Sequence, residues 1–166
     1  MQVPSGADPA EVLDRLVADG LPGGRGLEAW RSLLIAHATL MRRLGAELEG
    51  ETGLSLSEFD VLAQLAGAHG ELRMTELSER AFSSRSGMTR RIDRLVAQGL
   101  VRRVGSASDA REVVVSITDA GVARLEEAGL VHVRGVSRLF VEQLDDQELA
   151  VLERALKKVI ADCSFG

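Results

Sequence analysis

The chain has 166 residues, of which 45% are hydrophobic and 27% are charged, and its formal net charge at pH 7 is −5. This composition excludes a disordered chain, and no apolar run approaches the roughly 18 residues that a membrane-spanning helix needs. The start, MQVPSGADPAEVLD, lacks the basic flank and apolar core of a secretory signal, so we expect one compact domain in the cytoplasm.

The first expected elements are two helices joined by a hinge. Residues 9–19 have an amphipathic pattern, and four glycines and a proline interrupt it in GLPGGRG. A long helix begins at Leu27, and its stripe ends at Gly50. Its apolar face recurs at steps of three and four: Leu27, Trp30, Leu34, His37, Met41, Leu44 and Leu48.

Two shorter helices follow. Ser55 and Glu58 have the spacing of a capping box, and the helix they begin is predicted to bury Leu62, Leu65 and Ala66. After a turn at Gly70, the segment RMTELSERAF predicts a third helix with an apolar face of Met74, Leu77 and Ala81.

The next helix, residues 84–98, has two different faces. Ser84 is a suitable N-cap, and Gly99 a suitable stop. The predicted buried face consists of Met88, Ile92, Leu95 and Val96. On the opposite face lie Ser86, Arg90 and Arg94.

A hairpin and two long helices complete the chain. VRRV and EVVVSIT predict two strands within residues 101–118, and Thr118 is placed to cap a helix that reaches Leu144. Asp145 and Glu148 have capping-box spacing at the start of the last helix. The order predicts a mainly α, α+β fold: a winged helix-turn-helix between long terminal helices.

Positive charge is concentrated in the middle of the chain. Between Glu71 and Arg111 there are nine arginines and five acidic residues, a balance of +4, so the other residues carry −9. Neighbouring Glu76, Glu79 and Asp93 offer an alternative, internal charge balance. Joined to the helix order and the basic hairpin, the cluster instead predicts double-stranded DNA as a partner.

The segments SLSEFDVLAQLA, MTELSERAFSSRSGMTRRIDRLVAQGLVRRV and SDAREVVVSITDAG resemble the winged-helix core of the MarR family of bacterial transcriptional regulators, over about residues 27–160. The resemblance implies that the start of helix 84–98 reads the major groove, that Arg111 reaches the minor groove, and that Asp109 orients the wing. Arg91 and Arg94 are expected to bind phosphate or, in part, the protein itself. The predicted DNA-binding residues are Ser84, Arg85, Ser86, Gly87, Thr89, Arg90, Arg91, Arg94, Asp109 and Arg111.

The resemblance also implies a homodimeric repressor that binds a pseudo-palindromic operator. The expected parts are an N-terminal extension (1–26), a first dimerisation helix (27–53), a DNA-binding lobe (54–118) and C-terminal dimerisation helices (119–166). Family members commonly bind small aromatic or anionic effectors. Candidate ligand residues are Trp30, His37, Met41 and Phe59, with core or dimer-interface packing as the alternative.

No catalytic or cofactor site is expected. The single cysteine, Cys163, excludes an internal disulfide framework, and the three histidines are too scattered for a preformed metal cluster, so we predict no metal. No nucleophile elbow or paired carboxylates are recognisable, which argues against an enzyme. The alternative function is a dimeric ligand-binding or protein-interaction module of the same fold without operator binding.

Overall fold

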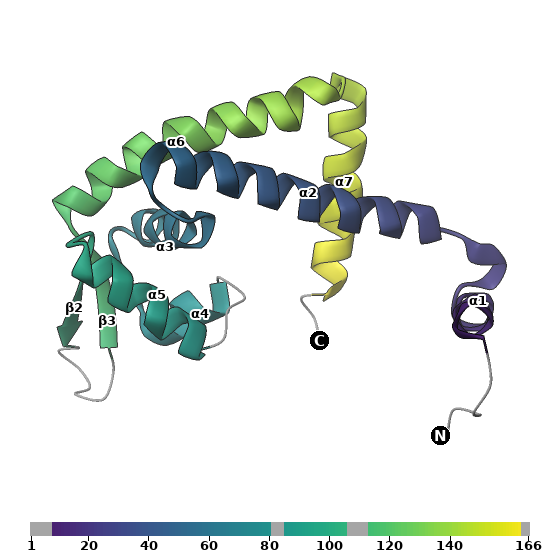
Figure 1. Ribbon diagram of the computed structural model, residues 1–166, viewed down its shortest axis with the longest axis horizontal. Helices are drawn as coiled ribbons and strands as arrows, with labels where there is room; N and C mark the ends of the chain where they lie inside the picture. Colours follow the sequence, from purple (N-terminus) through teal and green to yellow (C-terminus); the bar gives the residue numbers. More distant parts are fainter. Residues whose placement is uncertain (1–7, 81–84, 106–112, 164–166) are drawn as a thin grey trace. The chain divides into compact units, whose positions relative to one another are not determined.

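The computed structural model describes residues 8–80, 85–105 and 113–163, and the chain divides into two compact units, residues 1–40 and 41–166. The first unit contains α1 (Pro9–Gly20), a single 3-10 turn (Pro22–Gly24) and the first part of α2 (Leu27–Thr52) (Figure 1). Gly23, Gly24 and Gly26 have positive φ, so the predicted break between the helices is confirmed. Helix α2 continues two residues beyond Gly50, where its stripe was expected to end.

The second unit contains the rest of α2 and a small sheet among helices (Figure 1). Its further elements are α3 (Leu56–Gly67), β1 (Glu71–Arg73), α4 (Met74–Arg80), α5 (Arg85–Ala97), β2 (Val101–Gly105), β3 (Val113–Ile117), α6 (Asp119–Leu139), a 3-10 turn (Val141–Gln143) and α7 (Asp146–Cys163). This is the predicted mainly α, winged helix-turn-helix fold.

The helix ends follow the predicted side-chain chemistry. In the capping box of α3, Ser55 Oγ accepts from Glu58 N at 3.3 Å and Glu58 Oε2 accepts from Ser55 N at 3.0 Å. Thr118 caps α6 by accepting from Gly121 N at 3.0 Å. Helix α5 stops before Gly99, as expected, and Gly99 has a φ of +71°. The backbone N–H groups of Gly99 and Leu100 donate to the carbonyl oxygens of Val96 and Leu95, which closes the last turn.

Two predictions about helices are wrong. Helix α6 ends at Leu139 rather than Leu144, because the backbone leaves helical geometry at Phe140 and continues as a 3-10 turn. Ala66 is exposed, and Val61 takes its place in the core beside Leu62 and Leu65.

The sheet has three antiparallel strands in the order β1-β3-β2, rather than the two predicted. Leu72 pairs with Val115, and both side chains are buried. Ser116 is buried next to Val115, so burial does not alternate strictly along β3.

The core of the second unit lies where α3, α5 and the sheet meet, and α6 packs on α3. Two glycines allow close packing between elements of this unit. A Cβ on Gly135 of α6 would lie 2.8 Å from Leu44 Cδ2 of α2. At Gly121, a Cβ would lie 2.1 Å from the Leu100 carbonyl oxygen, so the start of α6 depends on glycine at this position.

Candidate nucleic-acid interface

Helix α5 is held on the protein by an apolar back. Met88, Ile92 and Leu95 are fully buried, which confirms three of the four predicted core positions. Val96 is 37% exposed, so its assignment to the buried face is wrong. Val96 lies in the last turn of α5, at the edge of the apolar face.

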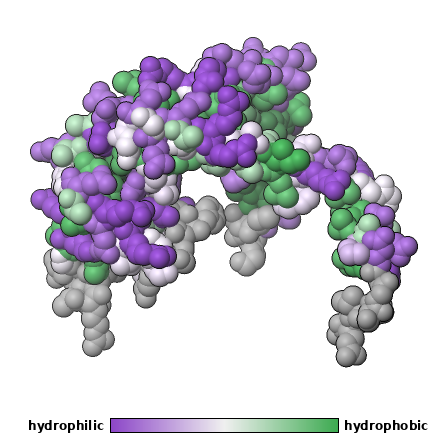
Figure 2. All heavy atoms as spheres, viewed as in Figure 1, coloured by the Kyte–Doolittle hydropathy of each residue, from purple (hydrophilic) through white to green (hydrophobic). Residues whose placement is uncertain are grey.

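The opposite side of α5 is open. Ser86, Arg90 and Arg94 are exposed, as their spacing predicts, and Figure 2 shows hydrophilic side chains over this helix. Gly87 and Thr89 are half-buried in the first turns, where small residues let a helix approach base edges closely. Arg91 is half-buried on the flank.

Two ion pairs fasten α5 to its neighbours. On one flank, Arg103 Nη2 of β2 donates to Asp93 Oδ1 at 2.6 Å. On the other, Arg94 Nε donates to Glu58 Oε1 of α3 at 2.9 Å. Both partners of α5 belong to elements of the same unit. The helix is therefore held by charge on both flanks and by apolar packing from behind.

Glu58 is a buried carboxylate with several donors, and sequence spacing identified only its capping role. Burial raises the pKa of Glu58, but hydrogen bonds from the Ser55 side chain and backbone, together with Arg94, outweigh this, so its pKa lies below the usual 4.5. Glu58 is therefore ionised at neutral pH.

The remaining cations are available to a ligand. Within the described parts of the chain, the exposed side chains of Arg90 and Arg102 form no ion pair or hydrogen bond. Arginine can bind a guanine edge or a phosphate with two parallel hydrogen bonds. An apolar back, small residues at the start and unpaired cations suit a helix that enters a major groove.

Several predicted site residues lie outside the described residues: Ser84, Asp109 and Arg111. Arg85 is the first residue of α5, but its side chain is not among those that the structure describes. Their roles at the start of the helix and in the wing stay predictions.

The predicted ligand residues fall in both units. Trp30 is 56% exposed and His37 is exposed in the first unit, and Met41, at the start of the second, is 38% exposed. Phe59 is half-buried on α3, where its ring centroid lies 4.9 Å from that of His132 on α6.

The sequence predicted no role for His132, because this residue is an isolated histidine on a helix with many apolar residues. Its Nδ1 is buried and has no hydrogen-bond partner among the described residues. Burial lowers the pKa of His132 below 6.5, so the folded protein favours the neutral imidazole.

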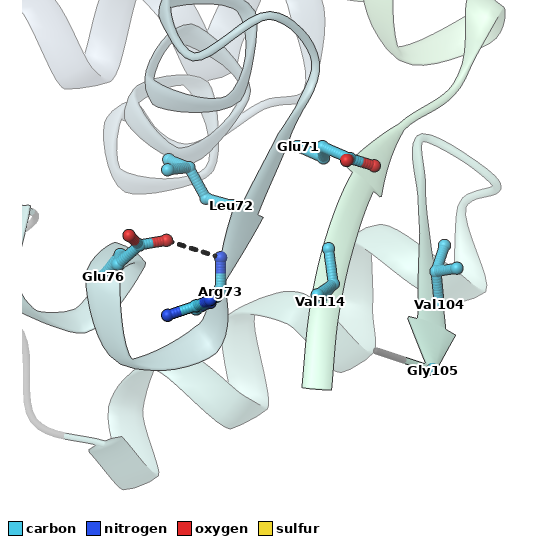
Figure 3. Close-up of a pocket in the computed structure, with 7 residues that line it drawn as sticks. All are labelled: Glu71, Leu72, Arg73, Glu76, Val104, Gly105 and Val114. Carbon is cyan, nitrogen blue, oxygen red and sulfur yellow. Dashed lines mark hydrogen bonds between the residues drawn. The ribbon is translucent and has the colours of Figure 1, made fainter. Parts of the chain in front are cut away.

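A pocket of about 450 Å³ opens between β1, the first turn of α4 and the wing strands (Figure 3). Val104 and Val114 pair in register and point to the same side of the sheet, and Glu76 Oε2 accepts from the Arg73 backbone N–H at 3.0 Å (Figure 3). None of the four predicted ligand residues lines this pocket.

The described residues contain no group of three or more His, Cys, Asp or Glu side chains arranged to hold a metal ion. No helix among them has the length and apolar character needed to cross a membrane.

Comparison with known proteins places these features in a family. The MarR family model matches residues 52–112, which include α3, α4, α5 and β2. The multiple antibiotic resistance protein MarR of Escherichia coli is 30% identical over 118 residues, which cover 71% of this chain and 81% of that protein. The transcriptional repressor MdtR of Bacillus subtilis is 30% identical over 97 residues, or 58% of this chain and 61% of MdtR.

Solved structures agree with the sequence relatives. Sco3205, a MarR family transcriptional regulator from Streptomyces coelicolor in complex with DNA, has a TM-score of 0.76 and 29% identity, and covers 81% of this chain and 84% of its own. A mutant MarR from E. coli complexed with operator DNA has a TM-score of 0.72 and 28% identity, over 87% of this chain and 97% of that one. The chain therefore belongs to the MarR family of transcriptional regulators, which are not enzymes.

Proposed function

We propose that this protein is a cytoplasmic, homodimeric and ligand-responsive repressor that binds a pseudo-palindromic operator. Residues 84–98 enter the major groove, and the wing, residues 101–118, reaches the minor groove. The observation that carries this proposal is the two-sided helix α5, with a fully buried back and an exposed Arg90 that has no side-chain partner among the described residues. Two related structures bound to DNA support it.

The site residues divide by chemistry. We assign base contacts to the small residues at the start of α5 and to Arg85 and Arg90, and phosphate contacts to Arg91 and Arg94. Arg111 is assigned to the minor groove, with Asp109 orienting the wing.

Exposed apolar residues support the homodimer. Leu130 and Val133 of α6 are 66% and 65% exposed, and Val151 and Val159 of α7 are 53% and 57% exposed. Figure 2 shows apolar atoms at the surface of α7. We propose that residues 27–53 and 119–166 bury such surfaces against a second copy.

The effector is a small aromatic or anionic molecule. Trp30, His37, Met41 and Phe59 are the proposed ligand residues, because they combine aromatic rings, a thioether and an imidazole. Thermal shift with benzoate and phenylacetate tests this part: a rise in melting temperature that Phe59→Ala abolishes supports it, and no shift with either acid contradicts it.

The DNA proposal is tested by selection from sheared genomic DNA followed by sequencing. The wild-type protein is expected to enrich a pseudo-palindrome. Arg90→Ala is expected to relax sequence choice and Arg111→Ala to weaken binding more uniformly, each by about 1–3 kcal/mol. Arg124→Ala on α6, whose guanidinium pairs with Glu127, is the matched control and keeps wild-type enrichment.

The result that contradicts operator binding is a wild-type protein that enriches no palindrome. A dimer that binds an aromatic acid but no DNA would support the second candidate, a ligand-binding or protein-interaction module of the same fold. The exposed basic face of α5 favours operator binding over this second candidate.

A further inference from the structure

Glu58 has one more contact than its helix requires. As the third residue of α3, it closes the capping box through Oε2, which accepts from Ser55 N at 3.0 Å and Ser55 Oγ at 2.7 Å. Its other oxygen, Oε1, accepts from Arg94 Nε of α5 at 2.9 Å. The Glu58 side chain is 7% exposed, so this carboxylate is fixed in place and reaches a residue 36 positions away.

Arg94 is held at one edge and open at the other. Its Nε is bound to Glu58, yet its side chain remains 61% exposed. Among the described residues, its two Nη groups have no other ion-pair or hydrogen-bond partner. Arg94 also lies four positions after Arg90 on the exposed face of α5. The outer edge of this guanidinium is therefore available on the face proposed to meet DNA.

We infer that Glu58 is a positioning residue for DNA binding, which holds Arg94 by Nε so that its Nη groups are preset for a backbone phosphate. The inference rests on the proposed function and adds to it a residue that does not touch DNA. A free arginine must lose rotamer freedom when it binds a phosphate, whereas a guanidinium already held at Nε loses less. Glu58 therefore raises the affinity for DNA without touching DNA itself.

Two other roles for Glu58 make different predictions. If Glu58 only neutralised Arg94, removing its charge would free a cation and tighten DNA binding. If the ion pair only joined α3 to α5, Glu58→Gln and Arg94→Gln would lower stability and weaken binding alike, and neither would change the salt dependence of binding.

The test uses the full-length protein, a duplex enriched by the genomic selection and a random-sequence duplex. Dissociation constants are measured by fluorescence anisotropy between about 50 and 200 mM salt for wild type, Glu58→Gln, Arg94→Gln and the double variant. Glutamine at position 58 also suits a capping box, so this variant is expected to fold. Glu127→Gln on α6 removes the same charge from another ion pair and is the matched control.

Glu58→Gln is expected to weaken binding to the selected duplex roughly two- to twelvefold per protomer, with the salt dependence unchanged. Arg94→Gln is expected to weaken binding and to reduce the slope of log affinity against log salt by about 0.9 per protomer, because a phosphate contact is lost. The double variant is expected to match Arg94→Gln alone, since Glu58 acts only through Arg94.

The inference is overturned if Glu58→Gln binds DNA as tightly as Glu127→Gln or more tightly. It is also overturned if the double variant loses more affinity than Arg94→Gln alone. An unchanged salt slope in Arg94→Gln overturns it independently of whether Glu58→Gln folds. Each of these results leaves the regulator proposal intact. If the wild type binds neither duplex at low salt, the proposed function fails, and the inference fails with it.

Discussion

His132 of α6 packs its ring on Phe59 and keeps Nδ1 buried. Because burial lowers its pKa in the folded state, the unfolded chain takes up a proton first as pH falls through 6.5. Stability is therefore lost from that pH downward. We expect a lower urea midpoint at about pH 5.5 than at about pH 7.5, and a smaller difference in His132→Gln.

The exposed His37 provides the control for this prediction, because His37→Gln is expected to keep the full wild-type difference. The carboxyl of Glu58 does not interfere, since its pKa lies below 4.5. An undiminished pH dependence in His132→Gln would show that another group is responsible.

Single residues show what spacing alone can predict. Met88, Ile92 and Leu95 were identifiable because helical periodicity fixes a direction around α5. Val96 and Ala66 were misassigned because periodicity does not say how far the neighbouring elements extend along a helix. For Arg94 the sequence left phosphate and protein as alternatives, and its partner Glu58 became evident only through the packing of α3 on α5.

At the scale of elements, the junction between β3 and α6 depends on Gly121. A Cβ there would meet the Leu100 carbonyl oxygen at 2.1 Å and Ile117 Cγ1 at 2.7 Å. We expect Gly121→Ala to lower the free energy of unfolding by about 1–3 kcal/mol, because this contact outweighs the better helix propensity of alanine. Urea denaturation measures the change.

Gly129, in the same helix, is the matched control. A Cβ there meets nothing within 4 Å, so Gly129→Ala is expected to raise stability by up to about 1 kcal/mol. Equal effects of the two substitutions would contradict the proposed steric role of Gly121.

Elements with their own capping chemistry were predictable, and those that depend on neighbours were not. Ser55, Thr118 and Gly99 mark three helix ends correctly because the caps are local in sequence. Strand β1 has only three residues and exists through its pairing with β3, so no local pattern indicated it. The end of α6 was also not predictable, because the apolar pattern of the sequence continues after Leu139.

For the whole molecule, the apolar surfaces of α6 and α7 predict that stability depends on association. If a second copy buries them, the melting temperature is expected to rise with protein concentration. Val159→Glu, at a position 57% exposed in the single chain, is expected to weaken dimerisation roughly tenfold or more, as measured by analytical ultracentrifugation.

Gln98→Glu, at an exposed position directly after α5, adds the same charge outside α2, α6 and α7 and is expected to leave dimerisation unchanged. A wild-type protein that sediments as a monomer at every concentration would contradict the homodimer.

Thr118, directly after β3, forms hydrogen bonds both to the residues that follow α5 and to the first turn of α6. Its Oγ1 donates toward the Gly99 carbonyl at 2.7 Å and accepts from Gly121 N at 3.0 Å, while its backbone N–H donates to the Leu100 carbonyl at 3.0 Å. The residues that directly follow α5 and the first turn of α6 are thus hydrogen-bonded to the same residue. We expect a tilt of α6 at this end to shift the end of α5 with it, because Thr118 is hydrogen-bonded both to the residues that follow α5 and to the first turn of α6.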